Sequence, residues 1–299
     1  FDIPQSIRRG RDLNSRSPKG EPALKAHKIR VEKKDLDKYL SIREIEGLSD
    51  VWLYDIRYFL TNYLDSIGWV IDEEQSLNYF KRIKSQYSTT SYRKQLYQIR
   101  KFLTFLGVEW TKEIKPPVEP YNIPKRVTIE DIKATILYFE KYKPSLRVKV
   151  RALILLGATS GMRAHELYQL KADDIDMEKR VVYINHNPKN GQSVKTGRSR
   201  ITFFNMEARK ELMKYLSLNG TDKLFPERQI QKLFENAPIR VKDLRKFFSQ
   251  EWDRRGGSTA IKKILMGHSL KGDVDLMHYN AQSEDDLKRI YDIVGIHIF

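Results

Sequence analysis

The chain has 299 residues, of which 55 are Lys or Arg and 39 are Asp or Glu, giving a formal net charge of +16. This surplus favours a polyanionic partner, and the apolar content of 40% excludes a disordered basic tail. The absence of Cys excludes disulfides, thiolate catalysis and Cys-based metal clusters. No apolar run approaches a membrane span, so we expect a cytoplasmic protein with no membrane partner. Because the first residue is Phe1, we expect a fragment or a processed product.

The first half of the chain predicts a basic arm followed by a small helical domain. Residues 1–30 hold eight Lys or Arg and show no apolar period, so we interpret them as an arm. From about residue 31 apolar residues recur at helical spacing, with Ser49 as a plausible N-cap. A further helix is expected to start near Thr90 or Ser91 and to end at Gly107. Residues 31–115 therefore predict a bundle of about four helices.

One face of the predicted helix that ends at Gly107 is basic. The residues on it that we expect to contact DNA are Arg93, Lys94, Arg100 and Lys101. Three prolines follow between Pro116 and Pro120, which favours an extended linker over residues 116–125. We place the domain boundary in this linker, ahead of a second domain over residues 126–299.

The second domain is predicted to be mostly helical with a small β-sheet. Thr128 opens a helix with a capping box, and a strongly apolar helix covers residues 148–156. Residues 157–161 are expected to turn before the next helix, which carries Arg163 and Glu166. The β-branched and aromatic runs 181–184 and 201–204 predict two strands joined by the segment 188–197. The predicted fold class is thus mainly α, with an α+β second domain.

Five short motifs in this domain suit attack on a phosphodiester by a side chain. Arg binds phosphate oxygens well because its planar fork donates two hydrogen bonds at once. Glu166 lies one turn after Arg163 and could brace its guanidinium. In chain order the motifs are Gly161-Met162-Arg163-Ala164-His165-Glu166, Lys195-Thr196-Gly197-Arg198-Ser199-Arg200, Lys242-Asp243-Leu244-Arg245, Gly267-His268-Ser269 and Tyr279.

In type and order, these motifs resemble those of the tyrosine recombinase (phage integrase) family. The resemblance implies that Tyr279 is the nucleophile and that Lys195, on a β-hairpin, protonates the leaving oxygen. It implies that the scissile phosphate is bound by Arg163, Lys242, Arg245 and His268. Arg200, next to the hairpin lysine, is expected to contact DNA. For residues 31–115 the resemblance is architectural: a helical core-binding domain precedes the catalytic one.

The chain departs from the family pattern at two places. Lys242 stands where the family usually has His, which points to the integrases of archaeal viruses and plasmids. His exchanges a proton near neutral pH and Lys normally does not, so the identity of the general base stays open. Tyr279 follows His268 by eleven residues rather than about nine. Tyr291 is therefore an alternative nucleophile, and Lys189, in the same loop as Lys195, is an alternative acid.

The resemblance implies a site-specific DNA recombinase that works through a 3′-phosphotyrosyl intermediate. It implies double-stranded DNA with a specific attachment site as partner, a homotetramer on that DNA, and no cofactor or metal. The alternatives are a type IB topoisomerase-like enzyme and a catalytically silent DNA-binding protein with the same fold. The sequence does not identify the attachment site, the host, the preferred direction, or whether the tyrosine acts in cis or in trans.

Overall fold

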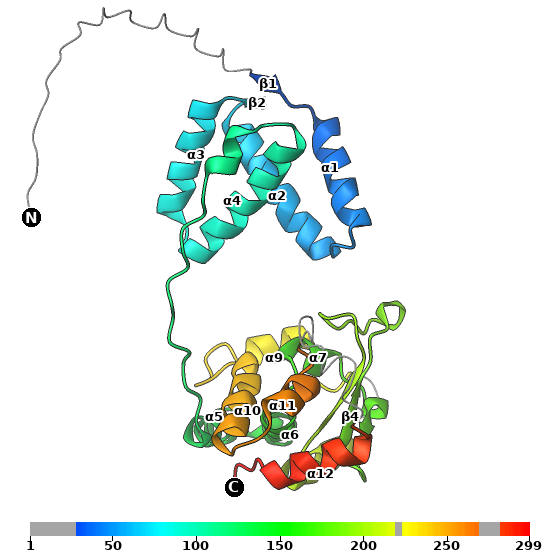
Figure 1. Cartoon of the computed structure of the whole chain (residues 1–299). Coiled ribbons are helices and arrows are strands. Elements are labelled where there is room, and N and C mark those ends of the chain that lie inside the picture. Colours follow the sequence, from blue (N-terminus) through cyan, green and yellow to red (C-terminus); the bar gives the residue numbers. More distant parts are fainter. Residues whose placement is uncertain (1–27, 219–222, 269–281) are drawn as a thin grey trace, which may run out of the picture. The chain divides into compact units, whose positions relative to one another are not determined.

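The computed structural model describes residues 28–218, 223–268 and 282–299. The chain divides into two compact units, Phe1–Ile123 and Pro124–Phe299 (Figure 1). Helices dominate both units and the sheets are small, which confirms the predicted mainly α fold. None of the helices in the described ranges is long and apolar enough to cross a membrane.

The first unit is a bundle of four helices around an apolar core. Ser49 precedes the second helix in an extended conformation, as predicted for an N-cap. The last helix begins at Thr89, slightly earlier than predicted, because the Ser88 hydroxyl accepts a hydrogen bond from the Ser91 N–H (3.4 Å). The helices are α1 (Lys33–Ile45), α2 (Asp50–Ser66), α3 (Glu73–Gln86) and α4 (Thr89–Phe105). The strands β1 (Ile29–Arg30) and β2 (Val70–Ile71) pair antiparallel beside them.

The second unit combines helices with one three-stranded antiparallel sheet of order β3-β4-β5. Its helices are α5 (Ile129–Tyr142), α6 (Arg147–Ser160), α7 (Ala164–Gln169), α8 (Met206–Leu218), α9 (Glu227–Leu233), α10 (Val241–Arg254), α11 (Thr259–Met266) and α12 (Glu284–Val294). Its strands are β3 (Ile175–Asp176), β4 (Val181–Ile184) and β5 (Arg200–Phe203). The two predicted strands are β4 and β5, and β3 was not predicted because its two residues are too few to show a period.

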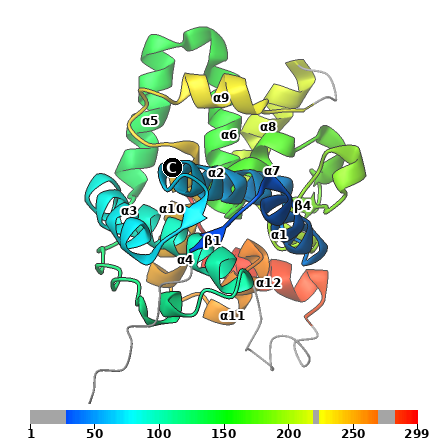
Figure 2. The same cartoon turned by 90° about the horizontal axis from the view of Figure 1, so that it is seen from above.

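Helix α6 is the centre of the second unit. It lies between α5 and α8 (Figure 2) and also packs against α10. Its side chains are buried all round from Ala152 to Ser160, which is why the sequence there is almost uniformly apolar. At Gly157 a Cβ atom would lie 2.7 Å from Leu244 Cδ1, so the glycine permits the close approach of α10.

The prediction that residues 157–161 form a turn was wrong for most of that segment. Helix α6 continues to Ser160 and ends at Gly161, which has the left-handed φ of +65° that favours glycine. Burial against α8 and α10 overrides the low helix propensity of Gly157 and Thr159. The turn is therefore confined to Gly161 and Met162, and Arg163 is the N-cap of α7.

Replacement of Gly161 by Ala is expected to destabilise the second unit by about 2–5 kcal/mol. The left-handed backbone costs an L-residue about 1–2 kcal/mol, and overpacking adds about 1–3 kcal/mol. The overpacking arises because the new Cβ would lie 2.4 Å from Phe248 Cδ1. Gly191→Ala is the matched control, since Gly191 also has a left-handed φ (+72°) but nothing lies within 4 Å of its Cβ position. Urea unfolding, followed by hydrogen exchange at the amides of α6, measures the free energy of unfolding of both variants. An equal loss in the two would contradict the role of Phe248.

Candidate functional site

Glu166 holds two arginines from distant parts of the chain. Its carboxylate accepts hydrogen bonds from Arg163 Nη1 (2.9 Å) and from the Arg163 backbone N–H (2.7 Å). It also accepts from Arg200 Nη1 (2.8 Å) and Nη2 (2.6 Å), a bidentate pair. The predicted contact between Glu166 and Arg163 is therefore present, and Arg200 adds a second, stronger one. The Glu166 side chain is 3% exposed, so this carboxylate is a structural anchor and not a surface group.

The arginines keep Glu166 ionised despite its burial. Burial alone would raise the pKa of this carboxyl group. The hydrogen bond and charge of Arg200, followed by the bonds from Arg163, outweigh burial and lower the pKa below its usual value. Glu166 is therefore a carboxylate at neutral pH, and its charge is used within the protein.

The C-terminal end of α11 provides the next set of contacts. Arg163 Nη2 donates to the Gly267 carbonyl (2.7 Å), and Arg200 Nε donates to the Leu265 carbonyl (3.0 Å). Cations are favoured there because the carbonyls at a helix C-terminus lack intrahelical partners. A Cβ atom at Gly267 would lie 2.7 Å from Arg200 Cδ, so glycine is needed for this approach. His268 follows directly and is thereby held beside the arginines.

Arg245 joins the same cluster from α10. Its Nη1 donates to the Gly161 carbonyl (2.7 Å), at the turn that precedes Arg163. Burial, followed by the positive charge of Arg163, lowers the pKa of Arg245 to about 10, so it remains charged at neutral pH. Within the described residues Arg245 has no acidic partner in an ion pair. The cluster of Arg163, Arg200 and Arg245 around Glu166 therefore carries unmatched positive charge, which suits an anionic ligand.

The same charges act on His268. Partial removal of water around the ring, and then the charges of Arg245 and Arg163, lower the pKa of His268. The imidazole is therefore mainly neutral at pH 7, and a neutral imidazole can both donate a hydrogen bond and accept a proton. The structure thus brings His268 within the electrostatic influence of Arg163 and Arg245, and its contact with phosphate stays a prediction.

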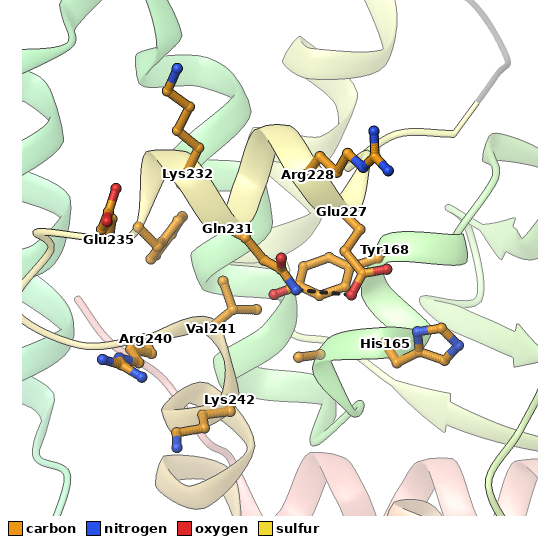
Figure 3. Close-up of a pocket in the computed structure, with 12 residues that line it drawn as sticks. His165, Tyr168, Glu227, Arg228, Gln231, Lys232, Glu235, Arg240, Val241 and Lys242 are labelled. Carbon is orange, nitrogen blue, oxygen red and sulfur yellow. Dashed lines mark hydrogen bonds between the residues drawn. The ribbon is translucent and has the colours of Figure 1, made fainter. Parts of the chain in front are cut away.

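Lys242 lies one turn before Arg245 and is exposed. It lines a cavity of about 760 Å³ between α7, α9 and the start of α10 (Figure 3). His165 and Tyr168 from α7 and Arg228 from α9 line the same cavity. Ala164, the residue after Arg163, also lines the cavity, whereas Arg163, Arg200 and Arg245 do not. Within the described structure Lys242 makes no hydrogen bond with the arginine cluster, so its role at the site stays a prediction.

The hairpin lysines lie in the long β4–β5 loop. Lys195 is in a tight turn in which the Gly197 N–H donates to the Val194 carbonyl (2.9 Å). Lys189 is in a separate short 3-10 turn, Pro188–Asn190, and both side chains are exposed. Neither is hydrogen-bonded to the arginine cluster in the part of the chain that the structure describes. Tyr279 lies outside the described residues.

The alternative nucleophile, Tyr291, is contradicted by its surroundings. It is 2% exposed on α12, its hydroxyl donates to the Thr159 carbonyl (2.8 Å), and its ring packs against Phe203 and Trp252. Burial raises the pKa of this phenol. A DNA phosphate could not reach it without unfolding the core, so Tyr291 is a structural residue.

Three residues predicted to contact DNA have other partners. Arg200 is 8% exposed at its side chain and its guanidinium is used by Glu166 and the Leu265 carbonyl, so it does not present a surface to DNA. Arg93 contacts the Pro117 carbonyl, and Arg100 Nε donates to the Thr111 carbonyl (2.9 Å). These two hold the segment that follows α4. Lys94 is exposed, and Lys101 lies over the Tyr97 ring.

Sequence reasoning missed the structural role of Arg200. Glu166 and Arg200 are 34 residues apart, so no local pattern reveals their contact. It also missed Gln169 and Asp174, whose side chains contact the β4–β5 loop. Polar residues of this kind carry no distinctive spacing. The one available signal was the position of Arg200 at the start of a predicted strand, in a chain segment that returns toward α7.

Comparison with known proteins gives a consistent result. Residues 125–283, more than half of the chain, match the model of the phage integrase family. The chain is similar to the tyrosine recombinase XerA of Pyrococcus horikoshii, with 26% identity over 249 residues that cover 78% of this chain and 85% of the relative.

Solved structures share the fold. The Tn1549 transposon integrase in complex with circular intermediate DNA is matched with a TM-score of 0.61 and 14% identity over 86% of this chain and 97% of that one. A lambda integrase tetramer bound to a Holliday junction is matched with a TM-score of 0.60 and 14% identity, over 79% of this chain and 77% of that one. At this level of identity the structures establish the fold.

Replacing Glu166 by Gln is expected to lower the free energy of unfolding by about 3 kcal/mol at pH 7, because it leaves buried arginines without their carboxylate. The pKa of Glu166 is lowered in the folded protein, so its contribution is fully present above the usual value of 4.5. That contribution is lost as the pH falls through the lower folded-state pKa. The difference between wild type and Glu166→Gln should therefore be constant from pH 8 to pH 6 and shrink in acid.

The matched control is Glu178→Gln, which changes an exposed carboxylate in the same unit. It should alter the free energy of unfolding by less than about 0.5 kcal/mol. Denaturant unfolding between pH 8 and the lowest pH at which the protein remains folded measures both variants. If the free-energy difference between wild type and Glu166→Gln did not change with pH, the lowered pKa of Glu166 would not contribute to stability as expected.

Proposed function

Because this chain belongs to the phage integrase family and is a tyrosine-type site-specific DNA recombinase, we propose that it binds double-stranded DNA at a specific attachment site and cleaves it with Tyr279. The proposal rests chiefly on one observation. Arg163 and Arg245 converge beside His268, and Glu166 with two backbone carbonyls fixes their positions. DNA, the proposed partner, has phosphodiester groups that such a positively charged site would bind.

The side chains of the site have distinct roles in this proposal. Arg163 and Arg245 donate hydrogen bonds to the non-bridging oxygens, where charge accumulates during the reaction. Lys242, one turn before Arg245 on α10, adds a third cation. His268, with its lowered pKa, donates to the phosphate from one nitrogen and can accept a proton at the other.

Cleavage in this proposal forms one bond to phosphorus, breaks another and transfers two protons. The Tyr279 oxygen bonds to phosphorus while the bond from phosphorus to the 5′-oxygen breaks. The phenol proton passes to His268 or to water, and a proton of the Lys195 ammonium passes to the 5′-oxygen. The products are a 3′-phosphotyrosyl bond and a 5′-hydroxyl. The 5′-hydroxyl of a partner strand reverses the step, so the bond energy is retained and no nucleotide cofactor is needed.

We extend the proposal to the organisation of the chain. Residues 1–30 form a basic arm, 31–115 a core-binding domain, 116–125 a linker and 126–299 the catalytic domain. The division of contacts between Ile123 and Pro124 supports this boundary. A homotetramer on DNA is supported by the shared fold with lambda integrase, which was solved as a tetramer on a Holliday junction. Exposed Lys94 is the best candidate for a phosphate contact from the first unit.

Replacing Tyr279 by Phe is expected to abolish the covalent protein–DNA adduct while DNA affinity is retained, because only the attacking oxygen is removed. The duplex can be selected from a random-sequence library by its covalent attachment to the wild-type protein. It is then remade with a nick that traps the adduct for detection on a denaturing gel.

The matched control is Tyr291→Phe. This variant should still form the adduct, but it should be less stable by about 1–3 kcal/mol, because the buried Thr159 carbonyl loses its donor. An adduct with Tyr279→Phe, detected on the same trapping duplex, would show that the nucleophile is misassigned.

Lys242→Ala is expected to slow adduct formation by about 100-fold, the usual cost of one donor to a developing anion. Lys242→His should retain most of the activity, because His can still donate to the phosphate. Arg245→Ala should be slower than either, since it removes a bidentate donor and leaves the Gly161 carbonyl unpaired. Single-turnover rates on the trapping duplex measure all three. A wild-type rate for Lys242→Ala would place Lys242 outside the site.

A further inference from the structure

We propose that Gln169 is a positioning residue that fixes the loop of Lys195 relative to the helix of Arg163. The inference rests on the proposed function, because it takes Lys195 as the acid. Gln169 is the last residue of α7, and Arg163 is the N-cap of the same helix. A contact from Gln169 to the β4–β5 loop therefore links the phosphate-binding group and the acid through one turn and a half of rigid backbone.

The contact between Gln169 and the loop is specific. The Ser193 backbone N–H donates to Gln169 Oε1 (2.8 Å), two residues before Lys195. Because Oε1 must accept this bond, the Gln169 amide nitrogen faces the other way, toward the His165 ring and the Ser193 hydroxyl (3.5 Å). The amide is thus oriented by partners on both sides. Gln169 itself is partly exposed, whereas Ser193 is exposed.

A second set of bonds restrains the same loop close to Lys195. Gln192 Nε2 donates to buried Asp174 (2.8 Å), which also accepts from the Lys171 backbone N–H (3.0 Å). The Val194 N–H donates to His186 Nδ1 (3.1 Å). Gln192 is therefore held to the segment before β3, Ser193 to α7, and Val194 to the other side of the loop. Lys195 is the first residue beyond these ties.

This arrangement favours Lys195 over Lys189 as the acid. Asn187 and Gln192 form an antiparallel bridge that closes the short turn carrying Lys189 into a loop of its own. Ser193, which contacts α7, lies on the Lys195 side of that bridge. Proton transfer requires the ammonium to lie within hydrogen-bond reach of the leaving oxygen, and a displacement of about 1 Å can cost about 100-fold in rate. Lys195 is a long exposed side chain, so it depends on its backbone being fixed.

The test compares two forms of the trapping duplex. One has the natural 5′-bridging oxygen, and the other has sulfur at that position, a leaving group that needs no proton. Gln169→Ala is expected to slow cleavage of the oxygen duplex by about 10- to 100-fold and to cleave the sulfur duplex at close to the wild-type rate. DNA affinity should be unchanged. Gln169→Glu keeps an acceptor for the Ser193 N–H and should recover most of the rate on the oxygen duplex.

Three further variants separate the possible outcomes. Lys195→Ala should show the same rescue by sulfur, and the double variant should be no slower than Lys195→Ala alone, because both changes remove one function. Gln229→Ala replaces an exposed glutamine on α9 that bonds to Lys149 (3.4 Å), and it should match wild type on both duplexes.

The results can overturn the inference in three distinguishable ways. If Lys195→Ala is rescued by sulfur but Gln169→Ala is equally slow on both duplexes, Lys195 is the acid and Gln169 does not position it. If Lys195→Ala is not rescued, the proposed acid is wrong and the role of Gln169 falls with it; Lys189→Ala is then the next variant to measure on both duplexes. A Gln169→Glu variant as slow as Gln169→Ala would also contradict the Ser193 contact as the cause.

Discussion

The buried carboxylate of Glu166 is the interaction on which the rest of the site depends. It binds the guanidinium and backbone N–H of Arg163 and both outer nitrogens of Arg200. These arginines in turn hold the carbonyls of Leu265 and Gly267 at the end of α11. One carboxylate therefore joins α7, β5 and α11. Burying a charge is costly, and it is tolerated here because every partner is itself hydrogen-bonded and fixed.

Helix α6 supplies the backbone that this cluster is built on. Gly157 admits Leu244, and Gly161 admits the Phe248 ring, so α10 packs closely enough for Arg245 to reach the Gly161 carbonyl. The Thr159 carbonyl binds the Tyr291 hydroxyl, which anchors α12. The packing that positions Arg245 thus also makes Tyr291 a core residue. Gly161 both packs against Phe248 and accepts a hydrogen bond from Arg245, so changes there are expected to affect stability and function.

The net positive charge of the site comes from arginine charge that Glu166 does not neutralise. Of the arginines, Arg200 is neutralised by a bidentate pair, whereas Arg245 has no acidic partner in an ion pair within the described chain. Partial burial, followed by this remaining charge, lowers the pKa of His268, so the imidazole is mainly neutral near pH 7. Bound phosphate would relieve this repulsion, which predicts that DNA binding raises stability and weakens as salt concentration increases.

The sequence by itself determined the helical pattern, the two main strands, the order of the five family motifs and the local pair of Arg163 and Glu166. These features repeat over a few residues or lie three residues apart on one helix, so their spacing is visible in the chain. Only the tertiary structure decided that Arg200 is a structural partner of Glu166, that Tyr291 is buried, and that Gln169 contacts the loop of Lys195. Each of these depends on segments 24 or more residues apart meeting in the folded protein, and residue type alone does not say which polar groups are left facing solvent.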